Sequence, residues 1–334
     1  MTSLSVSSGI EHSCWYIDWT SWDTPVPEGV DMVNIFVGKI DLDNGNPTMG
    51  GFGNITPEKL DTFVKDCAAK NVKVKVSIGG AGGMYDNCWD VLNEGNTQAF
   101  AQMMVAFCQQ HNLAGVDFDY EELKSPEQEA LVGQLIKEFR TLDPNLEASL
   151  CTNAGFDAWK GGVQTILDAT SNNGKSLLSR LYIMSYYDPL DQEEGFIAQW
   201  ADWVKSSYGF TASQVTVGLD DFDANAYDIG EFAKWAGTNG FSTGYWAWNP
   251  ATPDQSNASA LKVLNSYKPL AQKAALASSR ISKTDDLNNL ETIVRRFESL
   301  APKTIPVLRR IASTVSAAFK KVSSKFCCCC VPVE

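Results

Sequence analysis

Residues 114–121 read Ala-Gly-Val-Asp-Phe-Asp-Tyr-Glu, and this stretch determines how the rest of the chain is interpreted. Side chains alternate between the two faces of a β-strand, so the three acidic residues share one face, and the valine, phenylalanine and tyrosine share the other. An apolar face of this kind packs against helices, while the acidic face lines an interior. The stretch therefore predicts a strand of an α/β barrel whose carboxylates point into the barrel.

Seven other short apolar runs resemble strands, and helical patterns lie between them. The expected strands lie near 13–19, 32–38, 72–78, 114–120, 146–151, 181–186, 214–219 and 243–248. The expected helices cover 57–70, 97–111, 126–141, 159–170, 194–206 and 229–238. Strands that alternate with helices form parallel βαβ units, and eight such units in about 250 residues fit a (β/α)8 TIM barrel. Periodicity leaves one alternative, an open doubly wound sheet.

The composition excludes several classes of protein. The 334 residues are 44% hydrophobic and 11% aromatic, which is enough for a large core and excludes wholesale disorder. A formal net charge of −13 argues against a nucleic-acid-binding protein, because phosphates would be repelled. The two histidines, His12 and His111, leave little room for a His-rich metal site.

Charge and cysteine content divide the chain into two parts. Residues 269–334 hold 11 Lys and Arg against five Asp and Glu (net +6), whereas residues 1–268 hold 16 against 35 (net −19). Apolar residues recur at helical spacing over 285–301 and 305–326, and four consecutive cysteines follow. We therefore expect a barrel domain over 1–268 and a small α-helical C-terminal region over 269–334, a basic amphipathic tail that ends in this four-cysteine tract.

The three carboxylates of the strand at 114–120 cannot all ionise cheaply in a barrel interior. Repulsion raises the pKa of at least one of them, so Asp117, Asp119 and Glu121 are expected to share a proton. Glu121 lies at the C-terminal end of the strand, where the active sites of such barrels lie. A carboxyl group that stays protonated near neutrality can act as a general acid. The spacing alone also allows a metal-binding acidic cluster or a solvated strand end.

The pattern Asp-x-Asp-x-Glu after a glycine resembles the signature of family 18 glycoside hydrolases, the chitinases and endo-β-N-acetylglucosaminidases. Four other segments agree with this resemblance, in the expected order along the chain. They are Trp15-Tyr16-Ile17-Asp18-Trp19 in the first strand, Ser77-Ile78-Gly79-Gly80 in the third, Met184-Ser185-Tyr186 in the sixth and Gly244-Tyr245-Trp246-Ala247-Trp248 in the eighth. The resemblance covers roughly residues 12–268, which is the expected barrel.

The resemblance implies substrate-assisted hydrolysis with net retention. Glu121 would protonate the glycosidic oxygen, and the substrate's own 2-acetamido oxygen would attack the anomeric carbon. Asp119 would hydrogen-bond the acetamido N–H, and Asp117 would tune Asp119. Tyr186 would hold the acetamido oxygen in line, and Trp248 would form the floor of the sugar subsite. No metal or organic cofactor is required.

The resemblance also implies further substrate-binding residues and three candidate activities. The substrate-binding residues would be Trp248, Met184, Tyr187, Asp188, Gly80 and Tyr16. Tyr187 departs from the family pattern, in which Asp or Asn usually follows the tyrosine of the sixth strand. The interval from 219 to 243 is too short for the insertion of deep-cleft chitinases, which implies a shallow, endo-acting groove. The expected substrate is a β-1,4-linked N-acetylglucosamine polymer, and the alternatives are endo-β-N-acetylglucosaminidase activity on N-glycans and a non-hydrolytic lectin.

The C-terminal tail predicts attachment to an anionic membrane. Its basic residues attract acidic lipids, and two or more acyl chains would make the attachment stable. The candidate sites of S-acylation are Cys327, Cys328, Cys329 and Cys330. The first residues lack the basic and apolar regions of a secretory signal, so we expect the cytosolic face of a membrane, a host membrane if the chain is a bacterial effector. A helix packed on the barrel and a dimerising helix are the alternatives.

Overall fold

The computed structural model describes residues 9–17, 26–50, 55–82, 85, 87–171, 175–220, 228–246 and 262–265. All of them belong to the first of the two units into which the chain divides, Met1–Gln272 and Lys273–Glu334. The helices expected over 285–301 and 305–326, the four-cysteine tract and Trp248 lie outside the described residues. The domain boundary at residue 268 and the basic tail therefore stay predictions.

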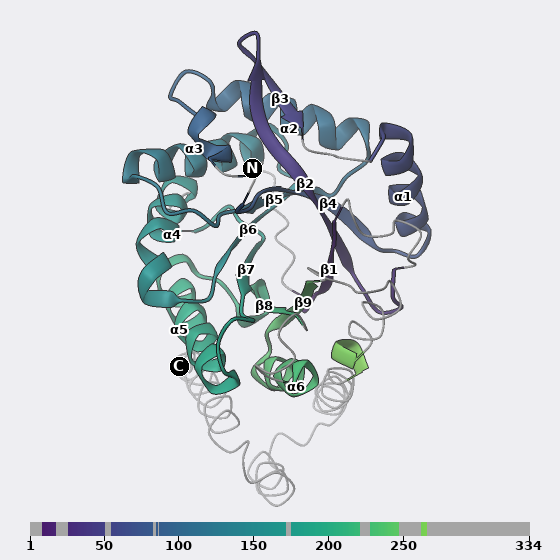
Figure 1. The fold of residues 1–334 in the computed structure, drawn as a ribbon, viewed down its shortest axis with the longest axis vertical. Coiled ribbons are helices and arrows are strands. Elements are labelled where there is room, and N and C mark those ends of the chain that lie inside the picture. The colour runs from purple at the N-terminus through teal and green to yellow at the C-terminus, as the bar shows by residue number, and fades with distance from the viewer. Residues whose placement is uncertain are drawn as a thin grey trace, which may run out of the picture. The chain divides into compact units, whose positions relative to one another are not determined.

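Eight parallel strands close into a barrel (Figure 1). They are β1 (His12–Ile17), β2 (Met32–Asp43), β4 (Lys73–Gly79), β5 (Gly115–Asp119), β6 (Glu147–Asn153), β7 (Arg180–Met184), β8 (Val215–Leu219) and β9 (Ser242–Trp246). The first strand pairs in parallel with both β2 and β9, and this double pairing closes the sheet. The TIM barrel is therefore confirmed, and the open doubly wound sheet is wrong.

Helices follow the strands and cover the outside of the barrel (Figure 1). They are α1 (Pro57–Ala69), α2 (Thr97–Gln110), α3 (Pro126–Leu142), α4 (Phe156–Thr170), α5 (Leu190–Tyr208) and α6 (Ile229–Asn239). Two of them begin with a proline after a hydroxyl cap, because Thr56 and Ser125 each accept a backbone N–H from the first turn at 3.3 Å. No helix in the described part of the chain is both long and apolar enough to cross a membrane.

The central strand β5 shows why the barrel has an apolar shell and a polar interior. Phe118 faces outward, where its ring lies 6.2 Å from that of Phe139 in α3. Tyr120 also faces outward, and its hydroxyl donates to Glu129 of α3 at 2.5 Å. Asp117 is fully buried on the opposite face, as the alternation predicts. Each buried aromatic or aliphatic side chain of the outer face contributes about 1.5–3 kcal/mol, which offsets the cost of burying carboxylates inside.

A β-hairpin extends one strand beyond the barrel and was not expected from the sequence. The expected strand at 32–38 continues as β2 to Asp43, and β3 (Asn46–Gly50) returns antiparallel to it. Figure 1 shows this hairpin projecting from the ring of strands. Asn44 and Gly45 have φ angles of 50° and 82°, which suit the tight turn between two antiparallel strands. The Asn-Gly pair was the available signal for this hairpin.

Candidate active site

Strand register brings the acidic residues of β5 next to two serines of the neighbouring strands. Asp117 is paired with Ser77 of β4 on one side and with Ser149 of β6 on the other. Asp119 lies two residues further along the same face, and Glu121 follows the end of the strand. The three predicted carboxylates therefore line one path toward the C-terminal end of the barrel.

Asp117 is held by both neighbouring serines. Ser149 donates to its Oδ1 at 2.6 Å, and Ser77 donates to its Oδ2 at 2.8 Å. Burial raises the pKa of Asp117, while the Lys75 ammonium and the two hydroxyl groups oppose that rise. Both carboxylate oxygens are thus occupied as acceptors. Among the residues that the structure describes, no group of three His, Cys, Asp or Glu side chains is arranged to hold a metal ion.

Asp119 and Glu121 interact, so the protonation of one carboxyl depends on that of the other. Burial raises the pKa of Asp119 well above its ordinary value, and the charges of Glu121 and Asp117 raise it further. Burial raises the pKa of Glu121 to about 7, while the backbone N–H of Ala81 and the Asp119 carboxyl oppose the rise. The Asp119 carboxyl interacts with the side chains of Cys151 and Glu121, and no N–H or alcohol hydroxyl group of the described residues donates to it. A buried carboxylate in this position can be satisfied by an N–H of a bound molecule.

The end of β4 brings the backbone close to Asp119. Gly79 has a φ of 115°, and a Cβ at this position would lie 2.1 Å from the carbonyl oxygen of Asp119. The N–H of Gly80 donates to that same carbonyl oxygen at 2.9 Å. Only glycine combines this positive φ with so close an approach. The predicted residue Gly80 therefore lies beside the carboxylates.

Aromatic and sulfur-containing side chains form a second buried cluster, separate from the main core. Its members are Trp15, Phe36, Tyr85, Cys151, Tyr182, Met184 and Tyr186. Burial raises the pKa of Tyr186 well above its ordinary value, and the charges of Tyr187, Glu121, Cys151 and Asp119 add to the rise. The predicted residues Met184 and Tyr186 thus lie on the same side of the barrel wall as the carboxylates.

Tyr187 and Asp188 follow Tyr186 in a loop that Glu193 holds in place. The Tyr187 side chain is 64% exposed, and its ring lies 4.7 Å from that of Tyr186. Burial of part of the side chain raises the pKa of Tyr187, and the charge of Glu121 adds to the rise. Glu193 is buried in the first turn of α5 and accepts the backbone N–H groups of Tyr187 and Asp188 at 3.0 Å each.

Replacing Glu193 with glutamine is expected to change how stability depends on pH. Burial raises the pKa of Glu193 to about 7, whereas the unfolded chain titrates near 4.5. Because the folded state holds this proton more tightly, its contribution to stability is lost as the pH rises from 4.5 through 7. Urea unfolding at pH 5.5 and pH 8 is expected to show wild type losing about 1–3 kcal/mol more than Glu193→Gln, which still accepts both N–H groups. Equal losses in the two proteins would contradict this.

The structure does not place two of the predicted substrate-binding residues, Tyr16 and Trp248, beside the carboxylates. Tyr16 lies on the outer face of β1, where its ring is 5.4 Å from that of Phe63 in α1. Its neighbour Trp15 instead belongs to the inner cluster, because adjacent residues of a strand face opposite sides. The expectation for Tyr16 is corrected accordingly. Trp248 lies outside the described residues.

Sequence reasoning did not single out two residues that contact the site. Ser149 donates to Asp117, and Lys75 donates to Ser149 at 2.8 Å. Both positions are inward-facing by alternation, and a charged residue in the middle of a buried strand was the signal that could have identified Lys75. The pairing of Ser149 with Asp117 depends on the register between β5 and β6, which no local pattern specifies.

Comparison with known proteins adds the family to this geometry. Residues 13–250 match the model of glycosyl hydrolases family 18. The chain belongs to this family. A comparison with curated proteins gives no match. The motif positions that suggested family 18 lie on β4, on β5 and after β7 in the barrel, with Ser77, Asp117 and Tyr186 among them.

Solved structures of family 18 and chitinase-like proteins share the fold of this chain. A GH18 chitinase from Pseudoalteromonas aurantia has a TM-score of 0.58 and 18% identity, over 77% of this chain and 99% of that chain. A chitinase-like agglutinin from Robinia pseudoacacia has a TM-score of 0.56 and 16% identity, over 76% and 99%. A mutant class V chitinase from Nicotiana tobaccum in complex with NAG4 has a TM-score of 0.59 and 11% identity, over 78% and 99%. At these identities the similarity shows the fold alone.

Proposed function

We propose that the chain hydrolyses β-1,4-linked N-acetylglucosamine by endo-acting, substrate-assisted catalysis with net retention, as a chitinase-like enzyme. One observation carries this proposal: the Glu121 carboxyl, whose pKa burial raises to about 7, interacts with the fully buried carboxyl of Asp119, to which no N–H or alcohol hydroxyl group of the described residues donates. The first group can deliver a proton near neutrality. The second can accept the N–H of an acetamido group.

Glu121 acts first as an acid and then as a base. It gives its proton to the glycosidic oxygen while the C1–O bond breaks and the 2-acetamido oxygen forms a bond to C1. The leaving sugar departs as an alcohol, and an oxazolinium intermediate remains. The Glu121 carboxylate then takes a proton from water, whose oxygen attacks C1 and opens the oxazolinium ring. Two displacements at C1 give net retention.

Asp119 and Tyr186 orient the acetamido group in this proposal. The Asp119 carboxylate accepts the acetamido N–H, and its negative charge stabilises the positive charge that develops on the oxazolinium ring. This stabilisation is strong because Asp119 is fully buried, where little water screens the charge. Tyr186 stays protonated, since burial raises its pKa, and its hydroxyl donates to the acetamido oxygen.

The proposal predicts a loss of activity as the pH rises through about 7. Glu121 must be protonated to act as the acid, and burial raises its pKa to about 7, so the alkaline limb of the kcat/KM profile is expected there. The limb reports the titration of the coupled pair with Asp119. Rates with chitooligosaccharides between pH 4.5 and 9 would measure it. Activity that stays constant to pH 9 would contradict the assignment of the acid.

A substrate panel separates the proposed activity from its two alternatives. The folded protein is incubated with chitooligosaccharides and with high-mannose N-glycans, and the products are identified by mass spectrometry. Cleavage of chitooligosaccharides supports the proposal, and cleavage of N-glycans alone supports an endo-β-N-acetylglucosaminidase. Binding without turnover supports a lectin, an alternative favoured by the exposed Tyr187 in place of the usual Asp or Asn and by the likeness to a chitinase-like agglutinin.

We also propose that the tail attaches the barrel to the cytosolic face of a membrane. This part of the proposal rests on the sequence alone. Its net charge of +6 and its four consecutive cysteines suit an anionic surface and S-acylation. The test is the intact mass and membrane fractionation of the full chain from eukaryotic cells, compared with a variant that carries Ser at 327–330. A mass without acyl groups, or equal fractionation of the two proteins, would exclude the anchor.

A further inference from the structure

A chain of buried polar groups continues from the carboxylates toward the N-terminal end of the barrel. Lys75 of β4 is fully buried, and its Nζ donates to the hydroxyl of Ser149 at 2.8 Å and to that of Tyr182 at 2.9 Å. The Ser149 hydroxyl in turn donates to Oδ1 of Asp117 at 2.6 Å. A single hydroxyl group therefore joins the Lys75 ammonium to the Asp117 carboxylate.

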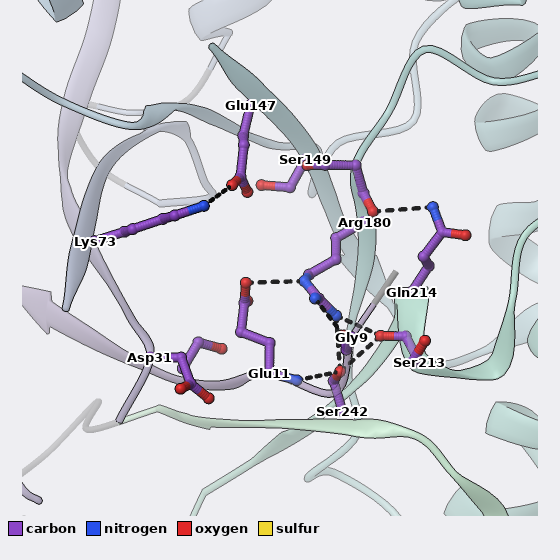
Figure 2. A network of polar contacts seen from close by, with 12 residues as sticks. Gly9, Glu11, Asp31, Lys73, Glu147, Ser149, Arg180, Ser213, Gln214 and Ser242 are labelled. Atoms are coloured by element: carbon purple, nitrogen blue, oxygen red, sulfur yellow. Dashed lines mark hydrogen bonds and ion pairs between the residues drawn. The ribbon is translucent and has the colours of Figure 1, made fainter. Parts of the chain in front are cut away.

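The other neighbour of Lys75 leads to an ion pair at the N-terminal end of the barrel. The Tyr182 hydroxyl donates to Oε1 of Glu11 at 2.8 Å, and Oε2 of Glu11 lies 3.0 Å from Nε of Arg180. Figure 2 shows Arg180 between Glu11 on one side and Ser213 and Ser242 on the other. The hydroxyl of Ser242 accepts from Arg180 Nη1 at 2.7 Å. Glu11 is therefore already neutralised by its own cation.

Two of the anions near Lys75 already have a cation of their own. Arg180 contacts Glu11 directly, and Lys73 contacts Glu147 at 2.7 Å at the start of β6. The anion left for Lys75, one hydroxyl away, is Asp117. A buried ammonium is retained only where an anion or several acceptors compensate for its lost hydration. Lys75 has two hydroxyl acceptors and this carboxylate.

We propose that Lys75 is a positioning residue for the hydrolysis proposed above: through Ser149 it keeps Asp117 as an anion, so that the shared proton of the acidic set lies on Asp119 and Glu121. This inference rests on the proposed function. An anionic Asp117 whose two oxygens both accept hydroxyl protons has no proton to offer Asp119. The proton then stays on Asp119 and Glu121, and Glu121 is the carboxyl that meets the glycosidic oxygen.

The groups that face Lys75 come from several elements, and their effects on the pKa of Lys75 oppose one another. Burial lowers the pKa of Lys75, the anions Glu11, Asp117 and Glu147 oppose this, and the cation Arg180 adds to it. The Tyr182 ring lies 4.7 Å from the ammonium and favours the charged form. Two hydroxyl bridges leave Lys75: Tyr182 leads to Glu11, which already pairs with Arg180, and Ser149 leads to Asp117.

Lys75→Met tests the inference by removing the cation with little change in side-chain volume. Loss of a nearby cation raises every macroscopic pKa of the acidic set, so the acidic limb of the kcat/KM profile is expected to move up by about one to three pH units. Lys73→Met is the matched control, because Lys73 lies on the same strand, is largely exposed and pairs with Glu147 instead. Its acidic limb is expected to coincide with that of wild type.

A pair of serine variants keeps the inference testable if Lys75→Met does not fold. Ser149→Ala and Ser77→Ala each remove one hydroxyl that donates to Asp117, but only Ser149 contacts Lys75. Ser149→Ala is therefore expected to raise the acidic limb by at least about half a pH unit more than Ser77→Ala. Equal shifts in the two variants, or an unchanged limb in folded Lys75→Met, would overturn the inference.

An infrared titration separates failure of this inference from failure of the proposed function. The C=O stretch of protonated Asp117, assigned as the band lost in Asp117→Asn, is followed against pH in wild type and Lys75→Met. Asp117 is expected to take up its proton at a pH about one to three units higher in Lys75→Met. If wild type cleaves no N-acetylglucosamine substrate, the proposed function fails whatever this band shows. If the band titrates alike in both proteins, the inference fails even in an active enzyme.

Discussion

Replacing Glu121 with glutamine is expected to lower kcat on chitooligosaccharides by about 10²–10⁴-fold, the usual contribution of a general acid. Glutamine has nearly the shape of protonated glutamate but has no proton to give. Burial raises the pKa of Glu121 to about 7, so a large fraction of this carboxyl carries a proton at neutral pH. KM is expected to change little, since the loss falls on the transition state. Initial rates with saturating chitotetraose or chitopentaose measure the effect.

Glu122→Gln is the matched control for Glu121→Gln. Glu122 is the next residue, but its carboxylate accepts the N–H of Asn87 at 2.9 Å and pairs with Lys124 at 2.8 Å. It therefore belongs to a partly buried ion pair with Lys124 and takes no part in the proposed proton transfer. Most of the activity is expected to remain in Glu122→Gln. Equal activity of the two variants would show that Glu121 is not the general acid.

Asp119→Asn is expected to lower kcat by about 10²–10³-fold through loss of charge stabilisation at the oxazolinium ring. Asp119 is fully buried, and no N–H or alcohol hydroxyl group of the described residues donates to its oxygens. Asparagine keeps one acceptor oxygen but carries no charge. The expected signature is a fall in kcat with little change in KM, measured on the same oligosaccharides.

Leaving-group dependence distinguishes the roles of Glu121 and Asp119. An aryl glycoside of N-acetylglucosamine with an acidic phenol needs little protonation to depart, so the defect of Glu121→Gln is expected to shrink with this substrate. Asp119 acts on the acetamido group, which is the same in both substrates. The defect of Asp119→Asn is therefore expected to persist. If the aryl glycoside reduced the defects of Glu121→Gln and Asp119→Asn equally, the separate roles of Glu121 and Asp119 would be contradicted.

Strand alternation made the acidic face of the barrel predictable. A strand has a side-chain period of two, so the sequence of β5 places Asp117 and Asp119 on one face without any knowledge of the fold, and the structure agrees. The alternation does not show which face of a strand points into the barrel when both faces carry aromatic side chains. Trp15 and Tyr16 of β1 are such a case: Tyr16 was expected to bind substrate, and Trp15 is the residue that faces the interior.

Contacts between strands were not predictable from local pattern. The hydrogen bonds of Asp117 to Ser77 and Ser149 depend on how β5 is aligned with β4 and β6, and tertiary packing sets this register. The hairpin of β2 and β3 was also not predicted, because after Ile40 its residues up to Asn46 are all exposed and show neither an apolar run nor an apolar alternation. The tail and Trp248, whose roles were inferred from residue types, stay predictions.

The ion pair and hydroxyl contacts at the N-terminal end of the barrel constrain how this chain can change by mutation. Removing Lys75 alone leaves the Asp117 carboxylate without its nearby cation, and removing Arg180 alone leaves the Glu11 carboxylate without its partner. Exchange of a complete buried pair for apolar residues is often tolerated, whereas loss of one partner costs about 3–5 kcal/mol. Descendants of this sequence are therefore expected to keep or lose such charges in pairs. Directed evolution of the barrel interior would then need double substitutions, because each single substitution of these charges lowers the stability of the protein.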